Sequence, residues 1–489
     1  MRIRCSLVFG AAVVGLSLPA SAADGIPFTI DPIQFNATLD ASAGAMSVRN
    51  AQFGQGSTSR TGQIEGGRTW YEGYVKPGLD FEWAGDGHGS IYGGLSFVAA
   101  ATRGAGEPVA NSTTSDQPEH VGLEKAMIGW RSGTVFDWAP TDAFDLSLGN
   151  QEFTLGDGFL IANGTADGAR RGALYLGPRA TFEKTVILRA NTDPVRVDLF
   201  HLSGTVDQVL MRGGDNPDTR LYGANIEWFE SKDSGRGRFD YDERLRYVGL
   251  TALKVYEADR AYSFSGSQGG GVVNANRDGL EVVSARFGGS FIPDLDDLSL
   301  YGEWGIERND DGSTGGRVRA SAWYLQPQYN FSALPWTPTL TARYAHFSGD
   351  KNTGDRVDRS WDPLFSDAGP RGSQTWVQGL IYGNYIGSNS NLNSLYAGAE
   401  VVPIDDVLRI GLAFYRHEYD HPSQAGASAK HLMDEVDLYA EWSTPVPGLS
   451  LAPGFAMGRS GQGQREALGI APGDARTIWL GQVVLAYRF

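Results

Sequence analysis

Short segments in which apolar and polar residues alternate recur along the whole chain, and Gly, Asp or Asn residues separate them. In the last segment Val483, Leu485, Tyr487 and Phe489 share one parity, and the chain ends on that final aromatic residue. A period of two is typical of β-strands whose two faces meet different surroundings. The repeated pattern therefore predicts an all-β fold made of many similar strands.

The segment from Trp70 to Trp83 shows the alternation most clearly. One parity carries Tyr71, Val75, Leu79, Phe81 and Trp83, and the other carries Glu72, Lys76, Asp80 and Glu82. A soluble β-sandwich, such as a secreted polysaccharide-binding module, would produce the same alternation with its charged face in water. A terminal strand that ends on an aromatic residue favours instead a closed transmembrane barrel, whose strands alternate between lipid and lumen.

The N-terminus has the features of an export signal. Two arginines precede an apolar run from Leu7 to Leu18, and the small-residue site Ala20-Ser21-Ala22 follows. This order predicts a cleaved secretory signal over residues 1–22, while Pro19 disfavours the alternative of a buried helix. Because Cys5 is the one cysteine and lies in that segment, we expect the exported chain to contain no disulfide.

Composition narrows the class of protein further. No second apolar run approaches the ~20 residues that a spanning helix requires, and the net charge of −16 disfavours nucleic acid as a partner. The alternating segments predict about eighteen antiparallel strands in one monomeric transmembrane β-barrel over residues 67–489, with residues 23–66 leading into it. A barrel of that size leaves an aqueous lumen, so we expect a channel in the outer membrane of a Gram-negative bacterium.

Two kinds of connection join the predicted strands. Tight turns are expected at residues 85–89 and 403–406, and long polar loops at residues 103–122, 265–278, 349–374 and 421–431. Long loops of such barrels lie outside the cell or fold into the lumen. The loop 349–374 contains an apolar cluster with Trp361, Asp362 and Phe365, which is a candidate gate. A loop that packs on its own rim is the simpler interpretation.

Several local motifs occur in order over most of the chain, namely Gly149-Asn150-Gln151, Gly156-Asp157-Gly158, Thr181 to Thr185, Phe347 to Asp350, Asp362 to Phe365, Glu435 to Leu438, and Tyr487-Arg488-Phe489. Together they resemble the alginate export family of outer-membrane porins. The resemblance implies a large monomeric barrel with a basic lumen that conducts an anionic polysaccharide. It places Lys76, Lys125 and Gln151 among the residues that line the pore and guide the substrate.

The alternation adds further pore-lining candidates on polar strand faces. These are Arg246, Lys254, Arg317, Arg319, Arg343 and Arg409. They are interleaved with acidic residues, namely Glu72, Glu82, Glu303, Glu435, Asp437 and Glu441. The alternative interpretation is that these residues are ordinary lumen charges that pair across strands.

The motif His417-Glu418-Tyr419-Asp420-His421 matches the zinc-protease pattern H-E-x-x-H. That chemistry requires a helix, which brings both imidazoles to one metal. Here the motif continues an alternating strand and precedes Pro422, so the histidines would lie roughly 13 Å apart. We therefore expect no metal, no cofactor and no catalytic residue, and an outer-membrane enzyme with a site at the barrel rim remains the weaker alternative.

These observations give two hypotheses for a channel. The first is passive diffusion or export of an alginate-like anionic polysaccharide through a charged lumen, and the second is uptake of oligosaccharides or small polar solutes. The expected partners are outer-membrane lipid, the saccharide substrate and the barrel assembly machinery, which would recognise the strand with Tyr487 and Phe489. The resemblance also implies periplasmic polymer-export components as partners.

Overall fold

The structure is a computed structural model. It describes residues 25–58, 64–85, 87–105, 117–162, 164–166, 171–192, 194–206, 218–231, 244–258, 263–264, 271–272, 277–310, 316–366, 379–405 and 407–489.

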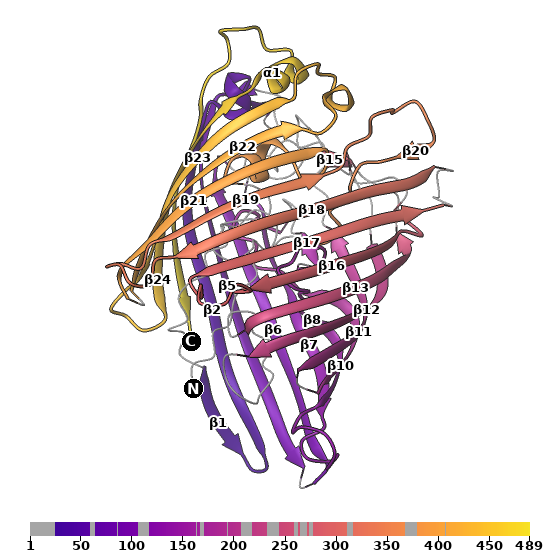
Figure 1. Cartoon of the computed structure of the whole chain (residues 1–489). Coiled ribbons are helices and arrows are strands. Elements are labelled where there is room, and N and C mark those ends of the chain that lie inside the picture. Colours follow the sequence, from indigo (N-terminus) through magenta and orange to yellow (C-terminus); the bar gives the residue numbers. More distant parts are fainter. Residues whose placement is uncertain are drawn as a thin grey trace.

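Eighteen antiparallel strands of the described chain close into one barrel, as the alternation predicted (Figure 1). They are β2 (Ile33–Arg49), β5 (Gly67–Gly85), β6 (Gly89–Gly104), β7 (Glu119–Arg131), β8 (Phe144–Gln151), β10 (Phe182–Asn191), β11 (Val195–Val206), β12 (Asp218–Ser231), β13 (Arg244–Ala258), β16 (Glu281–Gly289), β17 (Leu298–Asn309), β18 (Arg317–Asn330), β19 (Thr339–Phe347), β21 (Leu392–Ile404), β22 (Leu408–Tyr419), β23 (His431–Ser443), β24 (Leu449–Ser460) and β25 (Ile478–Arg488). Each strand pairs with the next, and β25 pairs back onto β2.

The other elements are short. The short strands are β1 (Ile26–Ile30), β3 (Ser57–Thr58), β4 (Ile64–Glu65), β9 (Thr165–Ala166), β14 (Ser263–Phe264), β15 (Gly271–Val272) and β20 (Val357–Asp358). The helical turns are η1 (Ala51–Gly54), η3 (Tyr382–Ile386), η4 (Pro422–Ala425) and α1 (Gln462–Leu468). No helix among the described residues has the length and apolar character to span a membrane.

The two ends of the chain form the seam of the barrel. The register between β2 and β25 runs from Asp40 opposite Arg488 to Arg49 opposite Trp479. The backbone of Phe489 continues the seam, because it exchanges hydrogen bonds of 2.9 and 3.1 Å with Leu39. The barrel therefore begins at β2 and not at residue 67 as predicted. The outward residues of β2 include several alanines. Their hydropathy differs too little from that of their neighbours for the alternation to be recognised.

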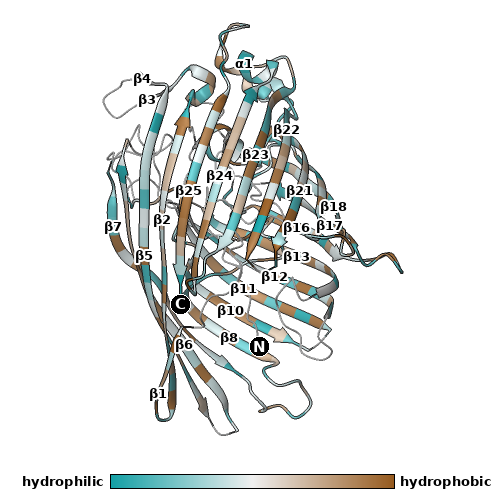
Figure 2. Ribbon diagram, turned by 90° about the vertical axis from the view of Figure 1, so that its left-hand side faces the viewer, coloured by the Kyte–Doolittle hydropathy of each residue, from teal (hydrophilic) through white to brown (hydrophobic). Residues whose placement is uncertain are grey.

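The outer and inner faces of the barrel wall differ in polarity, as the alternation of residues in the sequence predicted. On β5 the outward residues Tyr71, Val75 and Leu79 are exposed, whereas Trp70 and Glu72 are buried inside. Figure 2 shows the resulting alternation of hydrophobic and hydrophilic positions along the strands. Because strand pairing satisfies the backbone polar groups of the wall, this apolar outer face can lie against lipid hydrocarbon.

The two rims carry different connections. Short turns such as residues 331–338 and 444–448 lie at the rim that also holds the described N- and C-terminal ends. The longest connections, residues 152–181 and 348–391, and helix α1 start from the opposite rim (Figure 1). In outer-membrane barrels short turns face the periplasm and long loops face outward. We therefore call the rim with the long connections the outer rim.

Candidate functional site

Two long connections turn from the outer rim into the barrel. The first inner loop (residues 152–181) joins β8 to β10, and the second inner loop (residues 348–391) joins β19 to β21. Their described parts bury many large apolar side chains, which are Phe153, Leu155, Phe159, Leu160, Ile161, Tyr175, Leu176, Trp361, Leu364, Phe365, Leu380, Ile381, Tyr382, Tyr385 and Ile386. A lumen that would otherwise hold water is therefore partly filled by protein.

Carboxylates on the inner wall hold the first inner loop. Glu72 accepts a hydrogen bond from the backbone N–H of Leu176 (2.9 Å). Glu124 accepts hydrogen bonds from the backbone N–H groups of Ala180 (2.8 Å) and Thr181 (3.1 Å). Both carboxylates are buried. The backbone N–H groups of an irregular loop lose their hydrogen bonds to water when the loop is buried. They need such acceptors, because an unpaired buried N–H group lowers the stability of the fold.

The first inner loop also reaches other parts of the wall. Asp157 accepts hydrogen bonds from the hydroxyl of Tyr324 on β18 (2.7 Å) and the hydroxyl of Tyr247 on β13 (3.4 Å). The loop begins and ends on β8 and β10, several strands away. These contacts show that the loop extends across the lumen rather than along its own rim.

The two inner loops meet inside the barrel. Ile161 and Phe365 form a parallel β-bridge, in which the N–H of Ala162 donates to the carbonyl of Phe365 (2.9 Å) and the N–H of Phe365 donates to that of Leu160 (3.1 Å). The Phe365 ring packs edge-on against Phe182 at 5.2 Å between centroids. We call this contact the loop junction (residues 160–162 and 361–365).

A buried ion pair fixes the second loop at the junction. Arg277 donates two hydrogen bonds to the Asp362 carboxylate, one of them 2.7 Å long from Nε. The backbone N–H of Asp362 donates to Glu307 on the inner face of β17 (2.9 Å). All three side chains are buried. Removing one partner of such a pair leaves an uncompensated charge, so this contact strongly favours one loop position.

Small wall residues let the junction approach the strands closely. A Cβ atom added to Gly305 on β17 would lie 2.9 Å from the ring of Trp361. Phe159 packs against the same ring in a tilted arrangement, with 5.8 Å between the ring centroids. The predicted gate segment therefore lies inside the barrel, against the wall, and not on the rim.

The far end of the second inner loop is bound to β23. Glu435 accepts hydrogen bonds from the N–H groups of Ile381 (2.6 Å) and Tyr382 (2.9 Å), and Asp437 accepts one from Leu380 (3.1 Å). The Tyr382 ring stacks on His417 at 4.2 Å between centroids. Since His417 lies within the extended strand β22, it does not have the helical placement that the H-E-x-x-H chemistry requires.

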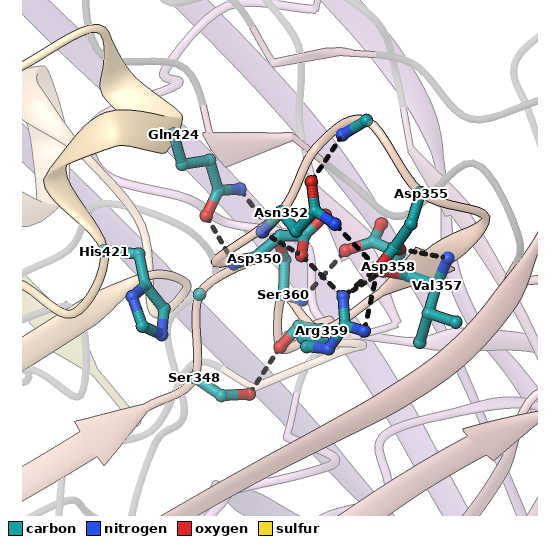
Figure 3. Close-up of polar contacts among 12 residues, drawn as sticks. Ser348, Asp350, Asn352, Asp355, Val357, Asp358, Arg359, Ser360, His421 and Gln424 are labelled. Carbon is teal, nitrogen blue, oxygen red and sulfur yellow. Dashed lines mark hydrogen bonds and ion pairs between the residues drawn. The ribbon is translucent and has the colours of Figure 1, made fainter.

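Residues 349–360 of the second inner loop do pack at the outer rim (Figure 3). Arg359 donates hydrogen bonds to Asp350 (3.1 Å) and Asp355 (3.0 and 3.2 Å). Gln424 of η4 accepts from the N–H of Asp350 (2.7 Å) and donates to Ser360 (2.7 Å). The loop is thus tied to the neighbouring loop before it descends into the lumen.

Helix α1 is held to the same rim by Glu466, which accepts hydrogen bonds from Ser428, Ala429 and Gln462. These bonds lower the pKa of Glu466 to about 2, with the bond from Gln462 the largest cause. Because the folded pKa is depressed, the contact should be fully present above the ordinary carboxyl pKa and lost as pH falls through about 2.

We expect backbone protection of residues 428–429 to persist at pH 4 in hydrogen exchange corrected for the intrinsic rate. Glu466→Ala, which removes the acceptor, should lose this protection at every pH, and equal protection in both proteins would contradict the assignment.

Some predicted pore cations do face the lumen, and carboxylates accompany three of them. Lys76 lies 3.6 Å from Asp40, Lys125 lies 2.5 Å from Asp80, and Arg409 lies 3.3 Å from Glu400 and 3.8 Å from Glu441. The buried Arg343 guanidinium lies over the ring of Tyr396 at 4.9 Å. Gln151 donates a hydrogen bond to Thr185 (2.6 Å). The lumen-facing cations among these residues therefore lie beside carboxylates or, for Arg343, over an aromatic ring.

Four other predicted pore cations face outward. Arg246 and Lys254 share the parity of the exposed Val248 and Leu250 on β13. Arg317 and Arg319 share the parity of the exposed Trp323 and Leu325 on β18. The prediction of lumen positions is wrong for these residues. Arg246, Arg317 and Arg319 lie within two residues of a strand end, and Lys254 lies four residues from the end of β13.

Sequence reasoning missed the first inner loop. Its signal was an interval of thirty residues, 152–181, in which the period-two alternation stops while large apolar residues continue. Long connections without regular structure in a compact protein are often functional. Phe153, Phe159 and Tyr175 could have marked it as a buried segment.

Comparisons with known proteins identify the fold. Neither protein-family models nor curated proteins match the sequence. Among solved structures, OccK2 (OpdF) of Pseudomonas aeruginosa has a TM-score of 0.52 at 11% identity, covering 93% of this chain and 97% of that chain. The BenF-like porin of Pseudomonas fluorescens Pf-5 has a TM-score of 0.52 at 10% identity, covering 93% and 98%. OccK11 (OpdR) of Pseudomonas aeruginosa has a TM-score of 0.51 at 12% identity, covering 93% and 96%.

These matches correct the predicted resemblance to the alginate export family, because the similar solved barrels are Occ and Opd proteins and a BenF-like porin. The short motifs that suggested it lie at strand ends, inside strand β23 and in the two inner loops, and they are too short to identify a family. The chain has the fold of 18-stranded outer-membrane porins, and it is an outer-membrane β-barrel protein of a Gram-negative bacterium.

Proposed function

We propose that the protein is a passive channel for small polar solutes, which enter the cell through a lumen narrowed by the two inner loops. The loop junction carries this proposal. It joins two connections from well-separated strands by backbone hydrogen bonds inside the barrel. A passage that runs beside such a junction admits molecules according to their size and polarity.

The charges of the inner wall also favour small solutes over a polymer. Conduction of a polyanion would need several cations that are free to attract carboxylates at one depth. Instead Lys76, Lys125 and Arg409 lie beside wall carboxylates. Paired charges of both signs suit neutral or zwitterionic polar solutes, whose hydroxyl, amino and carboxyl groups can bind either partner.

Swelling of proteoliposomes tests this function directly. We expect rapid swelling in monosaccharides and small amino acids, slower swelling in disaccharides, and none in large oligosaccharides. Planar-bilayer currents should be insensitive to added polyuronate. Refolded protein that shows heat-modifiable migration is the control for barrel closure. Absence of swelling with every small solute, or block of the current by polyuronate, would overturn the proposal.

A further inference from the structure

The outer face of β12, β13, β16, β17 and β18 contains a hollow of about 960 Å³. These five strands are consecutive neighbours in the barrel (Figure 1). One cross-strand row of outward residues lines it, in the order Ile226, Leu250, Ala285, Trp304 and Trp323. Ala285 has only a methyl group, and its neighbours Leu250 and Trp304 are 56% and 49% exposed. The hollow is therefore a depression between large apolar side chains on the lipid-facing side.

A second cross-strand row lies four residues nearer the outer rim on each of the same strands. It consists of Tyr222, Lys254, Glu281, Arg308 and Arg319 in the same order. Four residues of extended strand correspond to roughly 13 Å. The charged row and the apolar hollow thus occupy one face at two depths, with the charges toward the outer leaflet surface.

The charged row contains an unfavourable pair. Arg308 and Arg319 stand directly opposite each other on β17 and β18. Like charges at opposed positions of an antiparallel pair are destabilising. On the other side of Arg308 stands Glu281, whose carboxylate is 2.8 Å from the Lys254 ammonium. The arrangement would be relieved by an external anion.

Arg317 adds a third cation beside this pair. It is exposed and lies two residues from Arg319 on the same outward face. The pKa of Asp310 lies below its ordinary value, first because Arg319 donates a hydrogen bond to it and further because Arg317 and Arg308 contribute positive charge. Three guanidinium groups therefore converge on the region of one described carboxylate.

We propose that this face binds one phosphorylated, multiply acylated glycolipid of the outer leaflet. Its acyl chains would occupy the hollow between Leu250, Ala285 and Trp304, and its phosphate would lie among Arg308, Arg317 and Arg319. Arginine suits this role because its planar fork binds phosphate oxygens through two hydrogen bonds. The apolar depression and the cation cluster together match a ligand that has both parts in one molecule.

The test measures binding of a bisphosphorylated lipid A to the delipidated full-length barrel in mixed micelles. Arg308→Gln combined with Arg319→Gln should weaken binding roughly thirty-fold, since each basic group near an anionic surface contributes about fivefold. Ala285→Phe, which fills the hollow with an apolar side chain, should weaken binding severalfold without changing charge. Arg416→Gln combined with Arg459→Gln is the matched control. These outward arginines lie opposite Asp434 on another face and should not matter.

Heat-modifiable migration of each variant shows that its barrel is closed. Native mass spectrometry of protein extracted from outer membranes provides a second measurement, in which the fraction of protein that retains the glycolipid should fall in the two test variants. Unchanged binding in both test variants would overturn the proposal. Equal affinity for dephosphorylated lipid A, or for phosphatidylglycerol, would overturn it as well, because the site would then recognise any acyl chain or any anionic surface.

Discussion

An Asp362→Ala channel is expected to pass a severalfold larger single-channel current than the wild type. The Asp362 carboxylate neutralises the buried Arg277 and accepts a hydrogen bond from the backbone N–H of Leu364 in the same loop. Breaking a buried ion pair by removing one partner costs about 3–5 kcal/mol. This cost acts against the bound position of the loop, so residues 361–365 should leave the wall more often and widen the passage.

Asp355→Ala is the matched control for this variant. Asp355 lies in the same loop and pairs with an arginine, but at the solvent-facing rim, where an ion pair contributes little. Its current should equal that of the wild type. Currents measured in planar bilayers at several salt concentrations separate a wider passage from a change in surface charge. An Asp362→Ala channel with the wild-type current would show that the junction does not limit conduction.

Ala43→Arg is expected to destabilise the folded barrel by about 2–4 kcal/mol, the effect measured for arginine on the lipid face near the membrane midplane. Ala43 faces outward on β2, between Leu485 of β25 and Gly73 of β5. The variant therefore also tests the inclusion of β2 in the barrel wall. Urea unfolding in lipid vesicles, followed by tryptophan fluorescence, measures the change.

Ala43→Leu should leave the free energy of unfolding nearly unchanged, because a larger apolar side chain at this position meets lipid. If Ala43→Arg proved as stable as Ala43→Leu, residue 43 could not lie against hydrocarbon. The seam between β2 and β25 would then need revision.

Much of the fold could be predicted because lipid imposes a strict parity on every strand. Strands β5 and β25 carry large apolar residues at many outward positions, and their assignment is confirmed. Strand β2 escaped recognition because its outward residues include Ala41, Ala43 and Ala45, which alternate too weakly with their neighbours. Small residues can face lipid as readily as large ones. A strand whose outward residues are small therefore shows only a weak alternation in its sequence.

The interior was less predictable, for two physical reasons. An outward residue can be charged where a strand leaves the hydrocarbon layer. The rule that charged strand residues face the lumen therefore gave the wrong side for Lys254 and Arg319. The loop junction depends on contacts between residues far apart in sequence, such as Ile161 with Phe365 and Arg277 with Asp362. A local pattern indicated that residues 361–365 were apolar, but it could not show which strand or loop would receive them.

A cross-link across the loop junction tests the central claim most directly. Cys5 is the chain's one cysteine and lies in the predicted signal, so Ile161→Cys and Phe365→Cys can be introduced without competing thiols. Paired residues of a β-bridge are close enough for a disulfide. We expect the pair to oxidise readily in the closed barrel and the reduced channel, which lacks the Phe365 ring, to conduct more than the wild type. Oxidation should return the current toward the wild-type level. Failure to cross-link in a heat-modifiable barrel, or a current that does not change on oxidation, would contradict a lumen limited by these two loops.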